Sequence, residues 1–234
     1  FEPYTILVRS GIKIAVIGFT SPAIPHWVPH RVWADMRFDD IKESAEYWVK
    51  YVREQEQPDF VIGLFHSGMD EGIVTDDYRE NAVRQTISSV DGFDLVLYGH
   101  DHSSNMEEIE SPSGKSVLCV NAGSFAHSVA EVRIKFTLDE NGHAVKHDMD
   151  SQLYYIGKLN NVHCAEFKRH FKNDFLAVKK FASKKIGRFT RGVNVSDAYF
   201  GSSAYIDFIH QLQLEVSGAD ISFVAPFFLN ASIE

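Results

Sequence analysis

The sequence lacks an apolar run of about 18 residues, the length that a helix needs to cross a membrane. It also lacks an excess of basic residues: 23 lysines and arginines face 32 aspartates and glutamates, and the formal net charge is −9. Because non-specific binding to nucleic acid requires a basic surface, this charge argues against a nucleic-acid polymer as the partner. A small anionic substrate remains compatible with it where bound cations supply positive charge locally.

Cysteine and methionine are scarce, with two and four copies, whereas phenylalanine has 18. Two cysteines say little about the redox compartment, and Cys119, inside the apolar run 117–120, is typical of a small buried side chain. The hydrophobic fraction of 44% and the charged fraction of 24% exclude a disordered or fibrous chain. The first residue is Phe1 rather than Met and no signal peptide is visible, so we expect a processed or excised piece.

Within about the first 157 residues, strand and helix patterns alternate at first, and the later part is rich in strands. Proline-rich loops and an Asp cap separate these elements. The patterns predict a hairpin of residues 5–9 and 12–20, an edge strand at 33–38, a helix ending near 55, strands at 60–65, 94–98, 115–120 and 130–138, and a helix at 78–90. Such an order favours two sheets with helices outside them.

The composition changes after Lys158. Residues 162–184 predict one long amphipathic helix with a phenylalanine-rich stripe on one face and lysines on the other. We interpret the basic face as a solvated helix surface. A helix at 199–216 and a buried strand at 219–225 follow, which is typical of the beginning of a second domain.

Histidines follow two of the predicted buried strands. His66 comes directly after the strand at 60–65, and His100 and His102 lie in the turn after the strand at 94–98. In an open α/β sheet, functional residues gather beyond the carboxyl ends of the strands, and neutral imidazole is the commonest side-chain metal ligand. Each motif alone also fits a hydrogen-bonded strand end, but the three histidines together predict a metal site.

Two further residues are candidates for the surroundings of that site. Asp101, between the two histidines, either orients an imidazole as a hydrogen-bond acceptor or only forms the turn. Asn121, at the end of the next strand, either faces the site or forms a turn. We interpret three other histidines as ordinary surface or packing residues: His26, His30 and His127.

Several segments resemble one family, the metallophosphoesterases of the bacterial 5′-nucleotidase and 2′,3′-cyclic-nucleotide 2′-phosphodiesterase group. The resemblance lies in Gly11–Ser21, Val61–Gly68, Leu95–His102, Asn121–Gly123 and the stretch 202–226. It implies an α/β fold in which residues 1–158 form the C-terminal part of a metallophosphoesterase domain, a partial two-sheet αββα sandwich. Residues 159–185 would form a linker helix, and residues 186–234 the beginning of the 5′-nucleotidase C-terminal domain.

The resemblance also implies two divalent metal ions, of manganese, zinc, iron or cobalt, in the full-length protein. His66 and His100 would bind one ion and His102 the other. The family's Asp-x-His, Gly-Asp-x-x-Asp and Gly-Asn-His motifs do not occur in this chain, and we expect them before Phe1. They carry the bridging aspartate and the catalytic pair. We therefore expect no catalytic residue, weak or absent metal binding and no turnover in this chain alone.

The implied function is metal-dependent hydrolysis of nucleotide phosphoesters in catabolism or salvage. The segment Ala225-Pro226-Phe227 and the loop around Trp27 are more similar to the cyclic phosphodiesterase branch. A 5′-nucleotidase or nucleotide-sugar hydrolase is the alternative, and a non-catalytic remnant or binding module is the alternative of another class. A serine hydrolase is excluded by the missing Gly-x-Ser-x-Gly turn. The resemblance implies a periplasmic or cell-surface location, a nucleotide as the small-molecule partner and no membrane.

Overall fold

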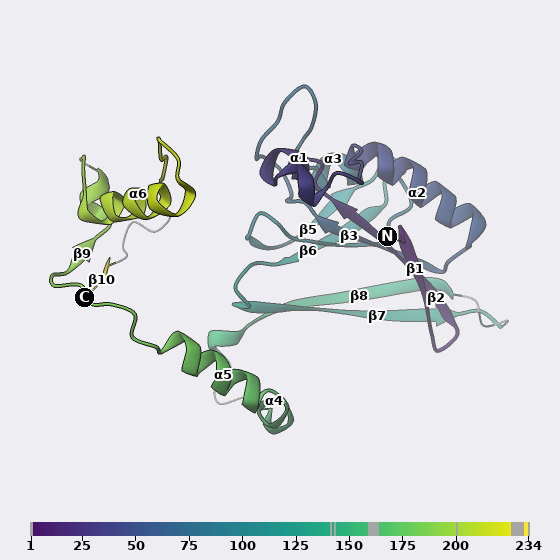
Figure 1. The fold of residues 1–234 in the computed structure, drawn as a ribbon. Helices are drawn as coiled ribbons and strands as arrows, with labels where there is room; N and C mark the ends of the chain where they lie inside the picture. Colours follow the sequence, from purple (N-terminus) through teal and green to yellow (C-terminus); the bar gives the residue numbers. More distant parts are fainter. Residues whose placement is uncertain are drawn as a thin grey trace. The chain divides into compact units, whose positions relative to one another are not determined.

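The structure is a computed structural model that describes residues 2–140, 142, 144–158, 164–199, 201–225 and 232–233. The chain divides into two compact units, residues 1–162 and residues 163–234 (Figure 1). All of the predicted metal ligands lie in the first unit. Among the described residues, no helix is both long enough and apolar enough to span a bilayer.

A six-stranded sheet forms the centre of the first unit, in the order β1-β2-β3-β4-β6-β5. The four inner strands run parallel, and β1 and β5 pair antiparallel at the two edges. The strands are β1 (Tyr4–Arg9), β2 (Ile12–Thr20), β3 (Phe60–His66), β4 (Leu95–Tyr98), β5 (Ser104–Glu110) and β6 (Ser116–Ala122). The predicted hairpin and the strands leading to the histidines are confirmed. β5 escaped prediction because its glutamate-rich pattern has little apolar signal.

Two helices cover one face of this sheet, α2 (Ile41–Gln55) and α3 (Val83–Ile87) (Figure 1). Asp40 begins α2, because its carboxylate accepts a hydrogen bond from the Glu43 amide at 3.0 Å. The helix then buries one stripe at helical spacing against the sheet, formed by Ile41, Ala45, Val49 and Val52. This packing forms the larger of the two apolar cores.

The other face of the sheet packs against a long hairpin of β7 (Ser128–Leu138) and β8 (Ala144–Tyr155) (Figure 1). Phe60 of β3 is fully buried there, with its ring 5.6 Å from Phe136 of β7. The second apolar core therefore lies between the two sheets, and the predicted α/β architecture with two facing sheets is confirmed.

Two predictions for the first unit are wrong. The helix predicted over 78–90 is limited to α3, because the preceding residues turn back on themselves in a bridge between Val74 and Arg79. Residues 33–38 form turns and irregular structure instead of an edge strand. Short helices complete the unit: α1 (Ile24–Trp27), η1 (His30–Val32) and η2 (Ile156–Lys158).

The second unit contains α4 (Ala165–His170), α5 (Lys172–Ala182), β9 (Val193–Asn194), η3 (Ser196–Tyr199), α6 (Ala204–Ser217) and β10 (Ser232–Ile233). The single helix predicted over 162–184 is interrupted at Phe171, whose φ of −93° and ψ of 8° leave the helical region. Part of the linker predicted at 159–185 lies outside the described residues. The domain boundaries at 158 and 185 stay predictions.

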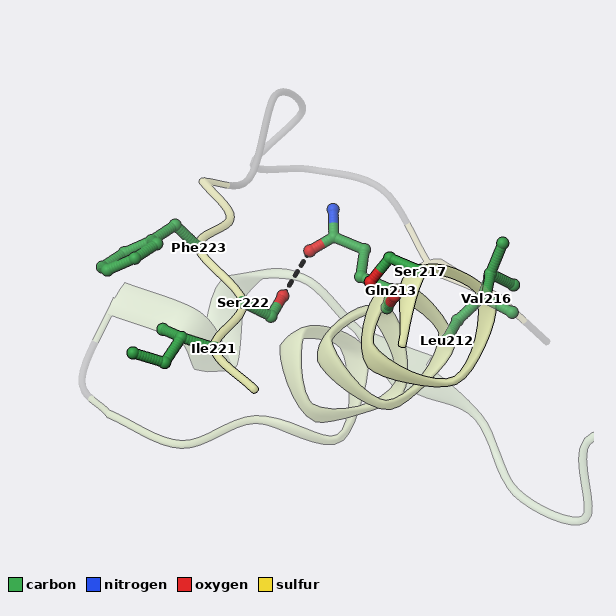
Figure 2. Close-up of a pocket in the computed structure, with 7 residues that line it drawn as sticks. All are labelled: Leu212, Gln213, Val216, Ser217, Ile221, Ser222 and Phe223. Carbon is green, nitrogen blue, oxygen red and sulfur yellow. Dashed lines mark hydrogen bonds between the residues drawn. The ribbon is translucent and has the colours of Figure 1, made fainter. Parts of the chain in front are cut away.

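The prediction of a buried strand at 219–225 is wrong. Its residues form no strand, and the side chains of Ile221 and Phe223 are 70% and 88% exposed. The segment instead runs beside α6, where Ser222 donates a hydrogen bond to the side chain of Gln213 (Figure 2). An apolar pattern alone does not bury a strand, because burial requires a sheet to pair with and a layer to cover it.

Candidate functional site

Two of the three predicted ligands meet at the carboxyl edge of the central sheet. β3 and β4 are parallel neighbours, with Phe65 of β3 opposite Tyr98 of β4, so both strands end at the same edge. His66 is the last residue of β3, and His100 follows β4 by two residues. Their ring centroids lie 5.0 Å apart. The structure therefore brings together two of the three predicted ligands through strand pairing alone.

His102 lies in the same turn as His100. Its side chain is exposed, and its ring is 5.9 Å from the ring of Phe125. His100 and His102 both have positive φ, 82° and 59°, a conformation that non-glycine residues seldom adopt and that clusters at functional sites. The turn therefore holds its two histidines in an unusual backbone geometry.

Burial lowers the pKa of His66, and the neighbouring His100 and His102 lower it further. All three effects disfavour the imidazolium form, because a buried charge loses water and like charges repel. A neutral imidazole retains a nitrogen lone pair, which is the form that binds a metal ion.

Asp101 connects the histidine turn to the neighbouring strand ends. Its carboxylate accepts hydrogen bonds from the Met69 amide at 3.0 Å, the Ser103 hydroxyl at 2.9 Å and the Asn121 side-chain amide at 2.7 Å. Asn121 is 1% exposed and in turn accepts a hydrogen bond from the Gly123 amide at 2.8 Å. These contacts agree with the turn-forming interpretation of Asp101 and place Asn121 beside it.

Gly68 shows how tightly the turn after β3 is packed. A Cβ at this position would lie 2.7 Å from the side chains of Asn81 and Asp101, closer than any carbon tolerates. The Gly68 amide donates a hydrogen bond to Asn81 at 2.8 Å. Asn81, in the segment before α3, and Asp101, in the histidine turn, therefore both pack against the residues that follow His66.

Sequence reasoning missed two residues that touch His100. The Glu80 carboxylate lies 2.8 Å from His100 Nε2, and the Trp27 ring stacks on the imidazole with centroids 5.2 Å apart and planes 19° apart. The sequence pattern places Glu80 within the helix predicted over 78–90 and gives its side chain no role. The only sequence signal for its role was the polar pair Glu80-Asn81 ahead of an apolar segment.

The donor set fits part of a metal site. Imidazoles suit zinc and iron among the expected metals, and two of them are in contact here. In the described part of the chain, no group of three histidine, cysteine, aspartate or glutamate side chains is arranged to hold an ion. His66 and His100 therefore fit as two ligands of an ion that would need its other ligands from further residues or water.

Comparisons with known proteins give a consistent result. An alignment over 115 residues, which covers 44% of this chain, is 32% identical to a 2′,3′-cyclic-nucleotide 2′-phosphodiesterase/3′-nucleotidase from Yersinia enterocolitica. The chain resembles the nucleotide phosphoesterases. The matched segment spans only 17% of that relative's length, and no family model matches the chain.

Solved structures show the same fold. The calcineurin-like phosphoesterase YfkN from Bacillus subtilis superposes with a TM-score of 0.61 and 19% identity, covering 79% of this chain and 60% of that one. A putative 5′-nucleotidase from Staphylococcus aureus gives a TM-score of 0.66 and 17% identity, covering 93% and 42%. The resemblance inferred from the motifs is confirmed, and so is the phosphoesterase fold.

Proposed function

We propose that the protein carrying this chain hydrolyses nucleotide phosphoesters with divalent metal ions, and that 2′,3′-cyclic nucleotides are its preferred substrates. The observation that supports this most directly is the contact of His66 and His100 at the carboxyl edge of a phosphoesterase-like sheet. The named function of the Yersinia relative supports the cyclic substrate. A nucleotide-sized ester also suits an acidic chain, because the metal ions rather than the protein supply the positive charge.

His66, His100 and His102 would hold the metal ions. Such ions polarise phosphoryl oxygens and lower the pKa of bound water. The protein's own contribution is to favour the neutral form of His66 and to hold the imidazoles in place. Burial lowers the pKa of His66, and Asp101 fixes the turn that carries the other two histidines.

The 5′-nucleotidase or nucleotide-sugar hydrolase alternative has the same site and differs in substrate. The putative 5′-nucleotidase from Staphylococcus aureus, whose fold is similar, supports this alternative. A non-catalytic remnant is the alternative of another class, and it predicts no metal-dependent turnover. For the location, we propose the periplasm or the cell surface, with no nucleic-acid polymer as partner.

The test uses the protein expressed with any flanking sequence that its gene encodes. Hydrolysis of 2′,3′-cyclic AMP and of AMP is measured with manganese, zinc and cobalt in turn. We expect kcat/KM to favour the cyclic nucleotide, and His100→Ala to lower it about 100-fold or more, since a ligand matters at least as much as its hydrogen-bond partners. His170→Ala, at an exposed position of α4, is the matched control and leaves the activity unchanged.

The outcomes separate the alternatives. A clear preference for AMP would replace the cyclic substrate with a 5′-nucleotide and leave the metal site in place. Full activity of His100→Ala would contradict the assignment of the site. Metal-independent turnover, or none with any of the three ions, would contradict the proposed function as a whole.

A further inference from the structure

The imidazole of His100 is held by groups on several sides. Glu80 Oε1 lies 2.8 Å from Nε2, Trp27 stacks on the ring face and the His66 ring lies 5.0 Å away. The side chains of His100 and Glu80 are only 18% and 17% exposed, so their hydrogen bond is largely shielded from water. A shielded bond between a ring nitrogen and a carboxylate determines both the orientation of the ring and the position of its proton.

The second oxygen of the Glu80 carboxylate also has a hydrogen-bond partner. Oε2 accepts a hydrogen bond from the Ile73 amide at 2.7 Å. Gly72, with φ of +73°, permits this approach, because a Cβ there would lie 2.8 Å from Oε2. An ionised carboxylate can only accept hydrogen bonds, so Glu80 accepts one from the Ile73 amide at Oε2 and can accept one from His100 at Oε1.

We propose that Glu80 is a positioning residue that keeps the proton of His100 on Nε2, so that Nδ1 is the nitrogen that binds a metal ion. Neutral imidazole carries one proton, and a carboxylate at Nε2 requires that the proton be there. The lone pair is then on Nδ1. A metal-binding histidine whose other nitrogen donates to a carboxylate is a more basic and better-oriented ligand. This inference rests on the proposed metal-binding role of His100.

The first test reads the proton position without any metal. The 234-residue chain is labelled with ¹⁵N-histidine, and the His100 tautomer is read by NMR at pH about 8, above the ordinary imidazole pKa. We expect the Nε2–H tautomer in the wild type and in Glu80→Gln, whose amide oxygen still accepts a hydrogen bond. Glu80→Ala should give a mixture. Asp76→Ala, an exposed carboxylate in the same segment, is the matched control and should match the wild type.

An Nδ1–H tautomer in the wild type would overturn the inference, and so would an unchanged Nε2–H tautomer in Glu80→Ala. These results do not depend on whether the protein is an enzyme. A purely structural role of Glu80 would lower the melting temperature without changing the tautomer.

The second test measures the affinity for cobalt(II) in the protein with any flanking sequence that its gene encodes. Glu80→Ala should bind cobalt roughly 10- to 100-fold more weakly than the wild type, with Glu80→Gln in between. Equal affinity of Glu80→Ala and the wild type would overturn the inference and leave the metal site standing. Complete loss of binding in Glu80→Ala, as in His100→Ala, would make Glu80 a ligand and also overturn it. Unchanged binding in His100→Ala would instead contradict the proposed function.

Discussion

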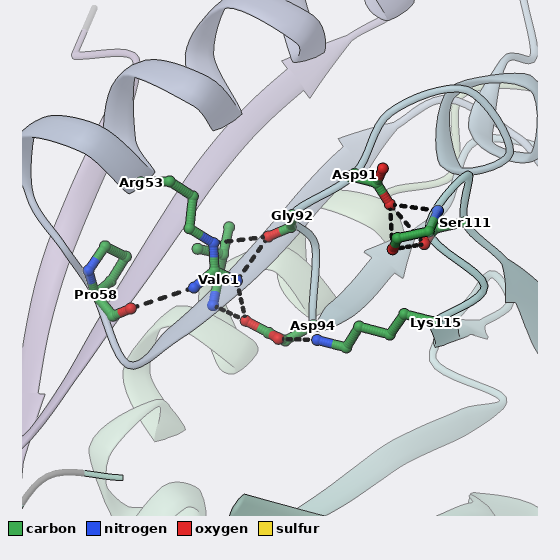
Figure 3. Close-up of polar contacts among 9 residues, drawn as sticks. Arg53, Pro58, Val61, Asp91, Gly92, Asp94, Ser111 and Lys115 are labelled. Carbon is green, nitrogen blue, oxygen red and sulfur yellow. Dashed lines mark hydrogen bonds and ion pairs between the residues drawn. The ribbon is translucent and has the colours of Figure 1, made fainter. Parts of the chain in front are cut away.

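Asp94 is a carboxylate whose side chain is only 5% exposed, and it lies just before β4. It forms ion pairs with Arg53 of α2 and with Lys115, and it accepts a hydrogen bond from the Val61 amide at 2.6 Å (Figure 3). Arg53 also donates to the Gly92 carbonyl, which connects the helix to the same turn (Figure 3). A buried charge persists only where it has such partners.

We therefore expect Asp94→Ala to lower the free energy of unfolding by about 3 kcal/mol, because it leaves a buried amide and a guanidinium without their acceptor. Urea unfolding followed by circular dichroism measures the change. Asp148→Ala is the control, since Asp148 forms an exposed ion pair with Lys146 at 3.1 Å that contributes less than about 1 kcal/mol. Equal losses in the two variants would show that Asp94 is not a structural anchor.

At the scale of elements, the β7–β8 hairpin depends on a few aromatic contacts with the central sheet. His147 of β8 packs its ring 4.8 Å from Phe60 of β3 and 6.1 Å from Phe136 of β7. Burial at this position lowers the pKa of His147, although the negative charge of Asp94 acts in the opposite direction. The folded hairpin therefore favours the neutral imidazole.

The pH dependence of stability follows from this shift. Below the ordinary histidine pKa of about 6.5, the unfolded chain takes up a proton at His147 more readily than the folded one. We expect the free energy of unfolding to fall as the pH drops from 7 to 5, and His147→Asn to reduce that slope. Thermal unfolding at several pH values gives the slope. Lys146→Asn, at the neighbouring exposed position, should leave it unchanged. A slope unchanged in His147→Asn would contradict the assignment.

At the scale of the whole molecule, the described part of this chain supplies imidazoles but few other metal ligands at the candidate site. Only two of the three histidine rings are in direct contact, and among the described residues no group of three suitable side chains surrounds a common point. Two-metal hydrolysis requires ligands for both ions and an open position for water.

We expect the 234-residue chain alone to show no metal-dependent hydrolysis of bis-p-nitrophenyl phosphate with manganese. Release of p-nitrophenol, followed by absorbance, measures it. The same assay on the protein with any flanking sequence that its gene encodes should show turnover. Substantial manganese-dependent hydrolysis by the chain alone would mean that the active site lies among residues we have not assigned.

The sequence by itself determined the elements whose signal is local. The buried strands at β3 and β4 could be predicted because continuous apolar runs end in polar residues, and the helix α2 because an Asp cap precedes an apolar stripe. His66, His100 and His102 could be named because each follows a strand whose end was visible. The family resemblance came from the same short motifs.

The tertiary structure decided what depends on partners distant in the chain. Glu80 and Trp27 reach His100 only after the segments around α1 and α3 fold over the sheet edge, and no periodicity marks such contacts. The helix predicted over 78–90 failed because the Val83 and Arg84 amides donate to the carbonyls of Gly68 and Met69 instead of to the preceding helical turn. The apolar segment 219–225 stayed exposed for the converse reason: its pattern is local, but burial requires a neighbour, and only the folded chain provides one.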